Sequence, residues 1–319
     1  MTTREAIRKA MADSMREDKN VVLLGEDVGV YGGCFKVTEG LVKEFPDQVI
    51  NTPVSEEGFT GLAVGAAMMG LRPIVEIMYA DFFTLIFDPI VNHAAKVHFM
   101  SGGAFNCPIV VRLPEGSGTG HGAQHTQSPE ALFMNSNGLK MVAPSCPSDA
   151  YHLLRAAIKD NNPVLFFEHK LLYGNEGEIS EEELPIGKAK VIREGSDLTI
   201  VSYSHAVKTA IRTAETLDEQ GIDSTVIDLC TLKPLDTETI FKSVRKTGRV
   251  VIIQDPAAFG GIASEVCSMI VTDKETFSSL KASPVICGGK NSPVPFSKDL
   301  ETRVIPSVDE CVKSALKLF

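Results

Sequence analysis

Short runs of β-branched and aromatic residues alternate with helical stretches along the whole chain, and this alternation restricts the fold most. In the first half the runs are VVLLGED, PIVEIM, PIVVRL, MVAP and PVLFFEH, at residues 21–27, 73–78, 108–113, 141–144 and 163–169. Helical patterns lie between them at residues 57–70, 83–99 and 148–160. Pro89 falls inside the second pattern and is expected in the first turn of a restarted helix. Strands that alternate with helices predict an α/β fold with largely parallel sheets.

The composition changes at residues 174–185, GNEGEISEEELP, which contain five glutamates and no basic residue. Such a stretch is typical of a solvated connector between domains. After it the alternation resumes with LTIVSYS at residues 198–204 and ends in a helix at residues 307–318. A chain of 319 residues has the length of two domains. We therefore predict two parallel-sheet α/β domains, residues 1–185 and 186–319.

Charge, cysteine content and hydropathy exclude several classes of protein. The net charge of −10 argues against non-specific nucleic-acid binding, which depends on basic side chains. The seven cysteines are scattered and include no C-x-x-C pair, so we expect neither a disulfide framework nor a zinc site. No stretch has the ~18–20 uncharged apolar residues of a membrane span, and the first helix lacks the apolar core of a signal peptide. We expect a cytoplasmic protein with no membrane partner.

The segment TPVSEEGFTGLAVGAAMMG, residues 52–70, combines two adjacent glutamates with a helix rich in glycine and alanine. Glycine in a helix interior costs about 1 kcal/mol relative to alanine, so the small residues need a reason, usually close helix–helix approach. Glu56 or Glu57 would then lie at a helix N-terminus in a buried interface. The alternative is that both are first-turn residues favoured by the helix dipole.

The segment PEGSGTGHGAQHTQSPE, residues 114–130, follows a predicted strand and carries His121 and His125. Its Gly118-x-Gly120-x-x-Ala123 pattern is a loosened dinucleotide fingerprint, but no helix follows it directly and no β-α-β unit opens there. A polar, glycine-rich loop at the carboxyl end of a strand is more typical of an active site.

Several motifs together resemble the β subunit of the decarboxylating dehydrogenase of 2-oxo acid dehydrogenase complexes, of the pyruvate, branched-chain or acetoin type. They are GEDVGVYGGCFKVTEGL, NTPVSEEGFTGLAVGAAMMGLRPIVE, GAQHTQSPEALF and AAIKDNNPV, and the likeness extends over nearly the whole chain. The resemblance implies a transketolase-like pyrimidine-binding domain followed by a transketolase C-terminal-like domain. It also implies thiamin diphosphate as the cofactor.

The resemblance assigns roles to three side chains. The family's glutamate is followed by any four residues, then a glycine, an apolar residue, any two residues and a second glycine, and here these glycines are Gly61 and Gly65. Glu56 fits this spacing, and Glu57 does not. Glu56 is therefore expected to bond the pyrimidine N1′ of the cofactor. Phe82 in MYADFF matches the aromatic that packs on the aminopyrimidine, although a core phenylalanine is the alternative. His125 matches the histidine that bonds the substrate carboxylate and shuttles protons, whereas His121 has no match.

The segment AAIKDNNP, residues 156–163, resembles one that binds a structural potassium ion in many relatives. The implied ligands are Asp160, Asn162 and the carbonyls of Ile109 and Ala157, and such hard oxygen donors suit an alkali or alkaline-earth ion. Helix-end capping and turn formation are the alternative.

The chain contains no Gly-Asp-Gly, the motif with which single-chain thiamin enzymes hold magnesium and the diphosphate. The resemblance places that half of the site, with its Mg²⁺, on an α subunit within an α2β2 heterotetramer. It implies oxidative decarboxylation, with pyruvate as the leading candidate substrate, and reductive acylation of a lipoyl group on an acyltransferase component. Acetoin and branched-chain 2-oxo acids are alternative substrates. A nicotinamide-dependent dehydrogenase and a non-catalytic scaffold subunit are the alternatives from other classes.

Overall fold

The computed structural model describes residues 1–319 and divides into two compact units. The first unit comprises Met1–Glu115 and Leu132–Ile186, and the second comprises Gly116–Ala131 and Gly187–Phe319. The main division at Ile186 lies next to the connector that the sequence places between residues 1–185 and 186–319. The segment Gly116–Ala131, which carries His125, groups with the second unit.

A parallel sheet forms the centre of the first unit, with strands in the order β5-β6-β4-β3-β1-β2. All five strands predicted in the first half are present, and β2 is an additional short strand at the edge. The strands are β1 (Val21–Gly25), β2 (Val49–Asn51), β3 (Arg72–Glu76), β4 (Val110–Glu115), β5 (Lys140–Val142) and β6 (Val164–His169).

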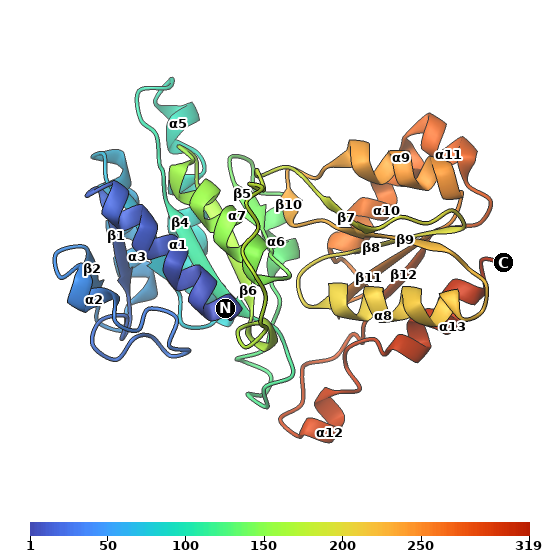
Figure 1. The fold of residues 1–319 in the computed structure, drawn as a ribbon. Coiled ribbons are helices and arrows are strands. Elements are labelled where there is room, and N and C mark those ends of the chain that lie inside the picture. The colour runs from blue at the N-terminus through green and yellow to red at the C-terminus, as the bar shows by residue number, and fades with distance from the viewer. The chain divides into compact units, whose positions relative to one another are not determined.

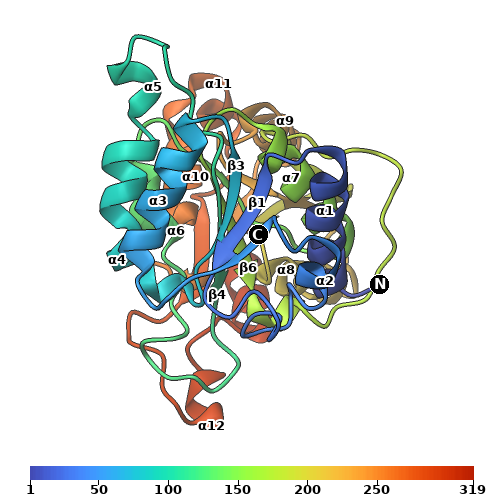
Figure 2. The same ribbon diagram turned by 90° about the vertical axis from the view of Figure 1, so that its left-hand side faces the viewer.

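Helices cover both faces of this sheet (Figure 2): α3 and α4 lie on one face, and α1 and α7 on the other. The helices are α1 (Thr3–Glu17), α2 (Leu41–Glu44), α3 (Glu56–Met68), α4 (Phe83–Asp88), α5 (Val97–Met100), α6 (Glu130–Met134) and α7 (Pro147–Lys159). Short 3-10 turns are η1 (Ala80–Phe82) and η3 (Lys170–Leu172), and η2 (Pro89–Ala94) is a π-helix. The stretch 83–99 is thus three segments, and Pro89 restarts the helix at its first position as predicted.

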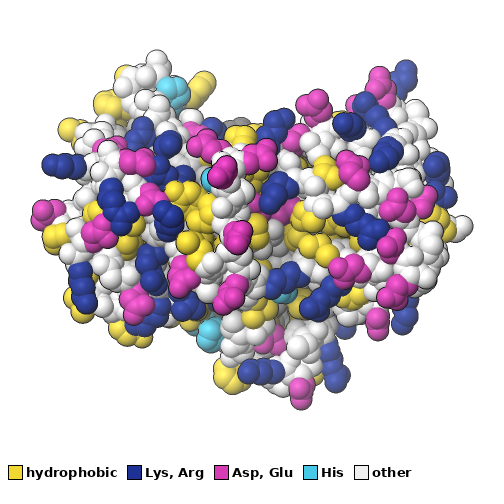
Figure 3. Space-filling view, in the orientation of Figure 1, with side chains coloured by type: hydrophobic (Ala, Val, Ile, Leu, Met, Phe, Trp, Pro, Cys, Tyr) yellow, Lys and Arg dark blue, Asp and Glu magenta, His cyan; other side chains and the backbone are white.

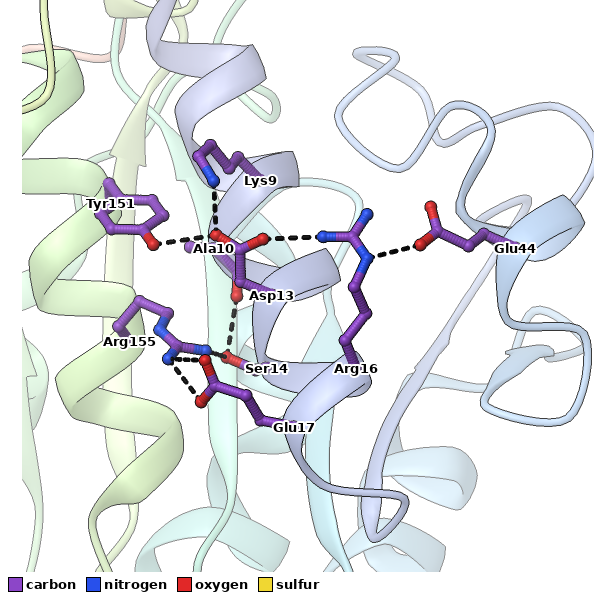
Figure 4. A network of polar contacts seen from close by, with 9 residues as sticks. All are labelled: Lys9, Ala10, Asp13, Ser14, Arg16, Glu17, Glu44, Tyr151 and Arg155. Carbon is purple, nitrogen blue, oxygen red and sulfur yellow. Dashed lines mark hydrogen bonds and ion pairs between the residues drawn. The ribbon is translucent and has the colours of Figure 1, made fainter.

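Polar contacts tie α1 to α7 (Figure 4). The Asp13 carboxylate accepts hydrogen bonds from Lys9 at 2.7 Å and from the Tyr151 hydroxyl at 2.9 Å. Arg155 on α7 donates to both carboxylate oxygens of Glu17 at 2.6 Å. Contacts of this kind near the surface contribute little to stability on their own.

A buried ion-pair network lies inside the sheet of the first unit. The Arg112 side chain on β4 is fully buried, and its Nε and Nη2 donate to the two carboxylate oxygens of Glu168 on β6 at 2.7 and 2.8 Å. Its Nη1 donates to Glu76, the cross-strand neighbour on β3. The Tyr173 hydroxyl also donates to Glu168, at 2.7 Å. Every ionic side chain in the network therefore has a partner.

The second unit has its own sheet, in the order β12-β11-β8-β9-β7. Four strands are parallel, and the edge strand β7 is antiparallel to β9. The strands are β7 (Lys190–Arg193), β8 (Leu198–Ser202), β9 (Ser224–Asp228), β11 (Val250–Ala257) and β12 (Val285–Gly289), and β10 (Thr231–Lys233) follows β9. The sheet is therefore mixed, because β7 enters from the connector and not from a crossover helix.

Helices cover both faces of the second sheet as well, with α9, α10 and α11 on one side and α8 and α13 on the other (Figure 1). These helices are α8 (Ala206–Asp218), α9 (Thr237–Thr247), α10 (Ile262–Thr272), α11 (Lys274–Ser279), α12 (Lys298–Glu301) and α13 (Val308–Leu316). The helix that the sequence predicts at residues 307–318 forms as α13.

The helices of both units fall short of the length and apolar character that crossing a bilayer requires. On the face shown in Figure 3, basic and acidic side chains are intermixed, including over α1 and α7. This face carries no extended patch of a single sign.

Candidate active site

Glu56 is the first residue of α3 in the first unit. The chain turns after β2, and Ser55 precedes the helix without a side-chain cap. Glu56 is only 7% exposed, whereas the neighbouring Glu57 is exposed. Burial strengthens the interaction of a carboxylate with a bound group, because screening by water is reduced. Of the two glutamates only Glu56 is buried, which agrees with the motif spacing that selects Glu56 over Glu57. Its catalytic role stays a prediction.

Glu26 is a second buried carboxylate at the same edge of the sheet. It follows β1 directly, and β1 pairs with β2, which leads into Glu56. Its side chain is 6% exposed, and its Oε1 has no hydrogen-bond partner. Burial, followed by the negative charges of Glu56 and Asp27, raises the pKa of Glu26 to about 7. Glu26 is not among the residues predicted from the sequence, although the acidic pair Glu26-Asp27 at the end of a buried strand is a usable signal.

We expect the raised pKa of Glu26 to make the protein less stable as pH rises. The folded state holds the proton up to about pH 7, whereas the unfolded carboxyl releases it near its ordinary value of 4.5. The loss of folding stability caused by ionising Glu26 is therefore absent below pH 4.5, grows between pH 4.5 and pH 7, and is complete above pH 7. Glu26→Gln should flatten the dependence of the free energy of unfolding on pH in this range, as measured by urea unfolding, and raise the stability at pH 8. The exposed Glu57→Gln is the control, and equal profiles for the two variants would contradict the assignment.

Phe82 belongs to an aromatic cluster that follows β3. Its ring is half-buried and contacts Tyr79 edge-on, with ring centroids 6.1 Å apart. Tyr79 in turn meets Phe35, at 5.4 Å, in the loop that follows Glu26. Because β1 and β3 are neighbouring parallel strands, Phe82 lies at the same carboxyl edge as Glu26 and Glu56. In open α/β sheets ligands bind at this edge.

His125 lies in the segment Gly116–Ala131 of the second unit. It is half-buried, and its N–H lies 3.4 Å from the Gly122 carbonyl, which also accepts the Thr126 hydroxyl at 2.6 Å. His121 is exposed, and its Nδ1 lies 2.9 Å from the Thr119 hydroxyl. The two histidines thus differ in burial as their different sequence matches suggest.

The backbone amides of the glycine-rich loop are already engaged. Gly118 N–H donates to Glu301 Oε1 at 2.6 Å, and Gly120 N–H donates to Glu301 Oε2 at 3.0 Å. A dinucleotide fingerprint needs such amides for the pyrophosphate. The chain's own carboxylate holds them here, which argues against the nicotinamide reading of this loop.

The residues expected to hold potassium gather where α7 ends and β6 begins. The Ile109 carbonyl accepts from Val164 N–H at 2.9 Å, and the Ala157 carbonyl accepts from Asp160 N–H at 3.2 Å. The Asp160 carboxylate pairs with Lys140 and accepts two hydrogen bonds from Asn162 at 2.9 Å. Burial would raise the pKa of Asp160, but these contacts with Lys140 and Asn162 together lower it. Because Lys140 already balances the charge of the Asp160 carboxylate, an ion at this place would need the carbonyl oxygens as further ligands. A monovalent cation can be bound in this way.

Comparison with known proteins identifies both units. Residues 1–176 match the family model of the transketolase pyrimidine-binding domain, and residues 187–311 match that of the transketolase C-terminal domain. Among solved structures, the chain is similar to the inactive beta4 tetramer of a split-gene transketolase, with a TM-score of 0.82 and 23% identity. That match covers 100% of this chain and 98% of the other and supports the fold.

Curated relatives match over all or nearly all of this chain. A pyruvate dehydrogenase E1 component subunit beta from Rickettsia felis is 46% identical, over 100% of this chain and 98% of the relative. A mitochondrial pyruvate dehydrogenase E1 component subunit beta-1 from Arabidopsis thaliana is 44% identical, over 99% and 88%. The resemblance drawn from the motifs is confirmed: this chain belongs to the family of pyruvate dehydrogenase E1 component beta subunits, built from transketolase pyrimidine-binding and C-terminal domains.

Proposed function

We propose that the chain supplies half of the active site of a thiamin-diphosphate-dependent pyruvate dehydrogenase. The reaction decarboxylates pyruvate oxidatively and acetylates a lipoyl group on an acyltransferase component. The observation that carries the proposal is the buried carboxylate of Glu56, at the start of α3, near Glu26 and at the same edge of the sheet as the Phe82 cluster. A buried acid and an aromatic cluster at the carboxyl edge of a parallel sheet suit an aminopyrimidine.

Each residue has a defined task in this proposal. When bound, thiamin diphosphate supplies the carbanion at its thiazolium C2, which is the difficult chemistry. Glu56 holds a proton at the pyrimidine N1′ and so controls the tautomer of the ring. Phe82 packs against the ring and orients it. Near pH 7 Glu26 is about half protonated, which reduces the negative charge next to Glu56.

His125 contacts the substrate in this proposal. An imidazole can donate a hydrogen bond to the substrate carboxylate and exchange protons near neutral pH.

Mg²⁺ and the diphosphate belong to the α subunit, since this chain has no Gly-Asp-Gly. We further propose that K⁺ binds the carbonyls of Ile109 and Ala157 together with Asp160 and Asn162, and that it stabilises the end of α7. A higher unfolding temperature in KCl than in NaCl at equal ionic strength would support the ion, and equal temperatures would exclude it.

The surface of α3 fits an α subunit as partner. Gly61 and Gly65 lie on an exposed face of the helix, and a Cβ atom at either position would have no neighbour within 4 Å. Leu62 and Met69 on the same helix segment are 63% and 84% exposed. Gly61 and Gly65 also line a groove of 380 Å³ with Pro89. Because no atom of this chain lies within 4 Å of a Cβ position on either glycine, we propose that an α-subunit helix packs there within an α2β2 heterotetramer.

Two substitutions at Gly65 distinguish effects on the stability of the chain from effects on its assembly with the α subunit. Gly65→Ala should stabilise the isolated chain by about 0.5–1 kcal/mol, because the position is helical and open. Gly65→Leu should leave the chain folded but prevent co-purification with the α subunit, since a large side chain blocks close approach. Lys242→Leu, at an exposed position of α9, is the control. Normal assembly of Gly65→Leu would contradict the proposed interface.

Reconstitution with the α subunit, the acyltransferase and the lipoamide dehydrogenase tests the function itself. NADH formation from pyruvate should exceed that from branched-chain 2-oxo acids and from acetoin, the two alternative substrates. A chain that is active without an α subunit, or that uses none of these substrates, would overturn the proposal. A cytoplasmic location is part of the same proposal.

A further inference from the structure

Four glycines occupy every second position from Gly116 to Gly122, and all four have positive φ. The angles are 88° at Gly116, 100° at Gly118, and 72° at Gly120 and at Gly122. Only glycine adopts this conformation at little cost. The winding turns the amides of Gly118 and Gly120 toward one point, which is the arrangement of an anion-binding nest.

The carboxylate of Glu301 occupies this nest. Each of its oxygens accepts one amide, at 2.6 Å from Gly118 and 3.0 Å from Gly120. The residue is 2% exposed and comes from α12, 183 residues farther along the chain than Gly118. Figures 1 and 2 both show α12 beside the loop that follows β4. Two hydrogen bonds to one buried carboxylate thus attach α12 to the loop within the second unit.

The attachment extends to His125 through Gly122. A Cβ atom on Gly122 would lie 3.6 Å from the Phe296 ring, so the loop also packs on the segment before α12. The Gly122 carbonyl then accepts the backbone N–H of His125 and the hydroxyl of the buried Thr126. A shift of Gly118 and Gly120 would therefore move His125.

We propose that Glu301 is a positioning residue that holds the loop of residues 116–125 so that His125 can act on the substrate. The role of His125 in this inference rests on the proposed function, whereas the attachment to Glu301 does not. The loop has no regular structure between β4 and α6, so its order depends on such contacts. It also forms one wall of a 420 Å³ cavity whose other walls include Asp255 and Lys290.

Glu301→Gln in the reconstituted enzyme tests the inference. The amide keeps one acceptor oxygen and turns an NH₂ group toward the second backbone N–H, so one hydrogen bond is lost. We expect kcat to fall roughly 10- to 100-fold, as for a misplaced catalytic group, and amide hydrogen exchange of residues 116–125 to accelerate. Asp299→Asn, at an exposed position of the same helix, should change neither.

A double-mutant cycle with His125→Ala distinguishes positioning from general destabilisation. If Glu301 acts through His125, Glu301→Gln should reduce the residual turnover of His125→Ala little or not at all. An equal loss in both backgrounds, or hydrogen exchange like that of Asp299→Asn, would overturn the inference. Gly118→Ala is the second variant if Glu301→Gln does not fold. Alanine is strained at a φ of 100°, so it should release the same loop, and unchanged exchange there would also overturn the inference.

The two proposals fail in different ways. If wild-type enzyme forms no NADH from any tested substrate, the proposed function is wrong, but the exchange rates of residues 116–125 still report on the attachment. If wild-type enzyme is active and Glu301→Gln behaves as Asp299→Asn does, only the role of Glu301 is wrong.

Discussion

Replacing Glu56 by glutamine is expected to remove most turnover of the assembled enzyme, with kcat lowered roughly 10²- to 10³-fold. The amide can still donate or accept a hydrogen bond, but it carries no charge and cannot favour a proton on the pyrimidine N1′. Burial makes this loss large, since Glu56 is 7% exposed and water does not compensate for the missing charge. Steady-state NADH formation in the reconstituted complex measures the effect.

Glu57→Gln is the matched control, because the two glutamates are adjacent in the first turn of α3 and differ in burial. We expect its kcat to stay within about twofold of the wild type, as for most surface changes. Size-exclusion chromatography should show intact tetramers for both variants. Equal losses at both positions would mean that the helix start matters only as a whole, and that the spacing to Gly61 and Gly65 does not select Glu56.

Most of the fold could be predicted from sequence because the buried strands have a simple pattern. Continuous apolar runs such as residues 21–27 and 163–169 become β1 and β6, whose residues are all buried. The break at Pro89 was also predictable, since proline tolerates only the start of a helix. The antiparallel strand β7 was not, because its residues are half-exposed and its short run resembles the connector beside it.

The site was less predictable because its residues meet only in three dimensions. Glu56 could be chosen by its spacing, but the raised pKa of Glu26 depends on burial and on a neighbouring carboxylate. The contact of Glu301 with Gly118 spans 183 residues, and no local pattern links them. At the predicted potassium site, Lys140 lies against the Asp160 carboxylate, and such a side-chain partner is not visible in one sequence.

The buried network of Arg112 connects the core to the site. Glu76, which accepts a hydrogen bond from Arg112, is the last residue of β3. It pairs with Gly25, the residue that precedes the loop carrying Glu26. A Cβ atom on Gly33 in that loop would lie 2.8 Å from Glu76 Oε1, and Gly33 has a φ of 77°. The loop therefore packs directly on the network and needs glycine to do so. We expect changes at Arg112 to affect both stability and this loop.

Arg112→Met is expected to destabilise the protein by about 3–5 kcal/mol, because it leaves Glu76 and Glu168 buried without a countercharge. The loss should be smaller at pH 5 than at pH 8. Burial already raises the pKa of Glu76 although Arg112 opposes this, so without Arg112 the folded protein binds a proton more readily than the unfolded chain. Urea unfolding at both pH values measures the difference. Arg155→Met, at an arginine paired with the exposed Glu17, should cost about 1 kcal/mol or less. Combining Arg112→Met with Glu76→Leu and Glu168→Leu should recover much of the stability, because no buried charge then remains unpaired. If Arg112→Met lowers the free energy of unfolding no more than Arg155→Met does, the buried network does not have the stabilising role described here.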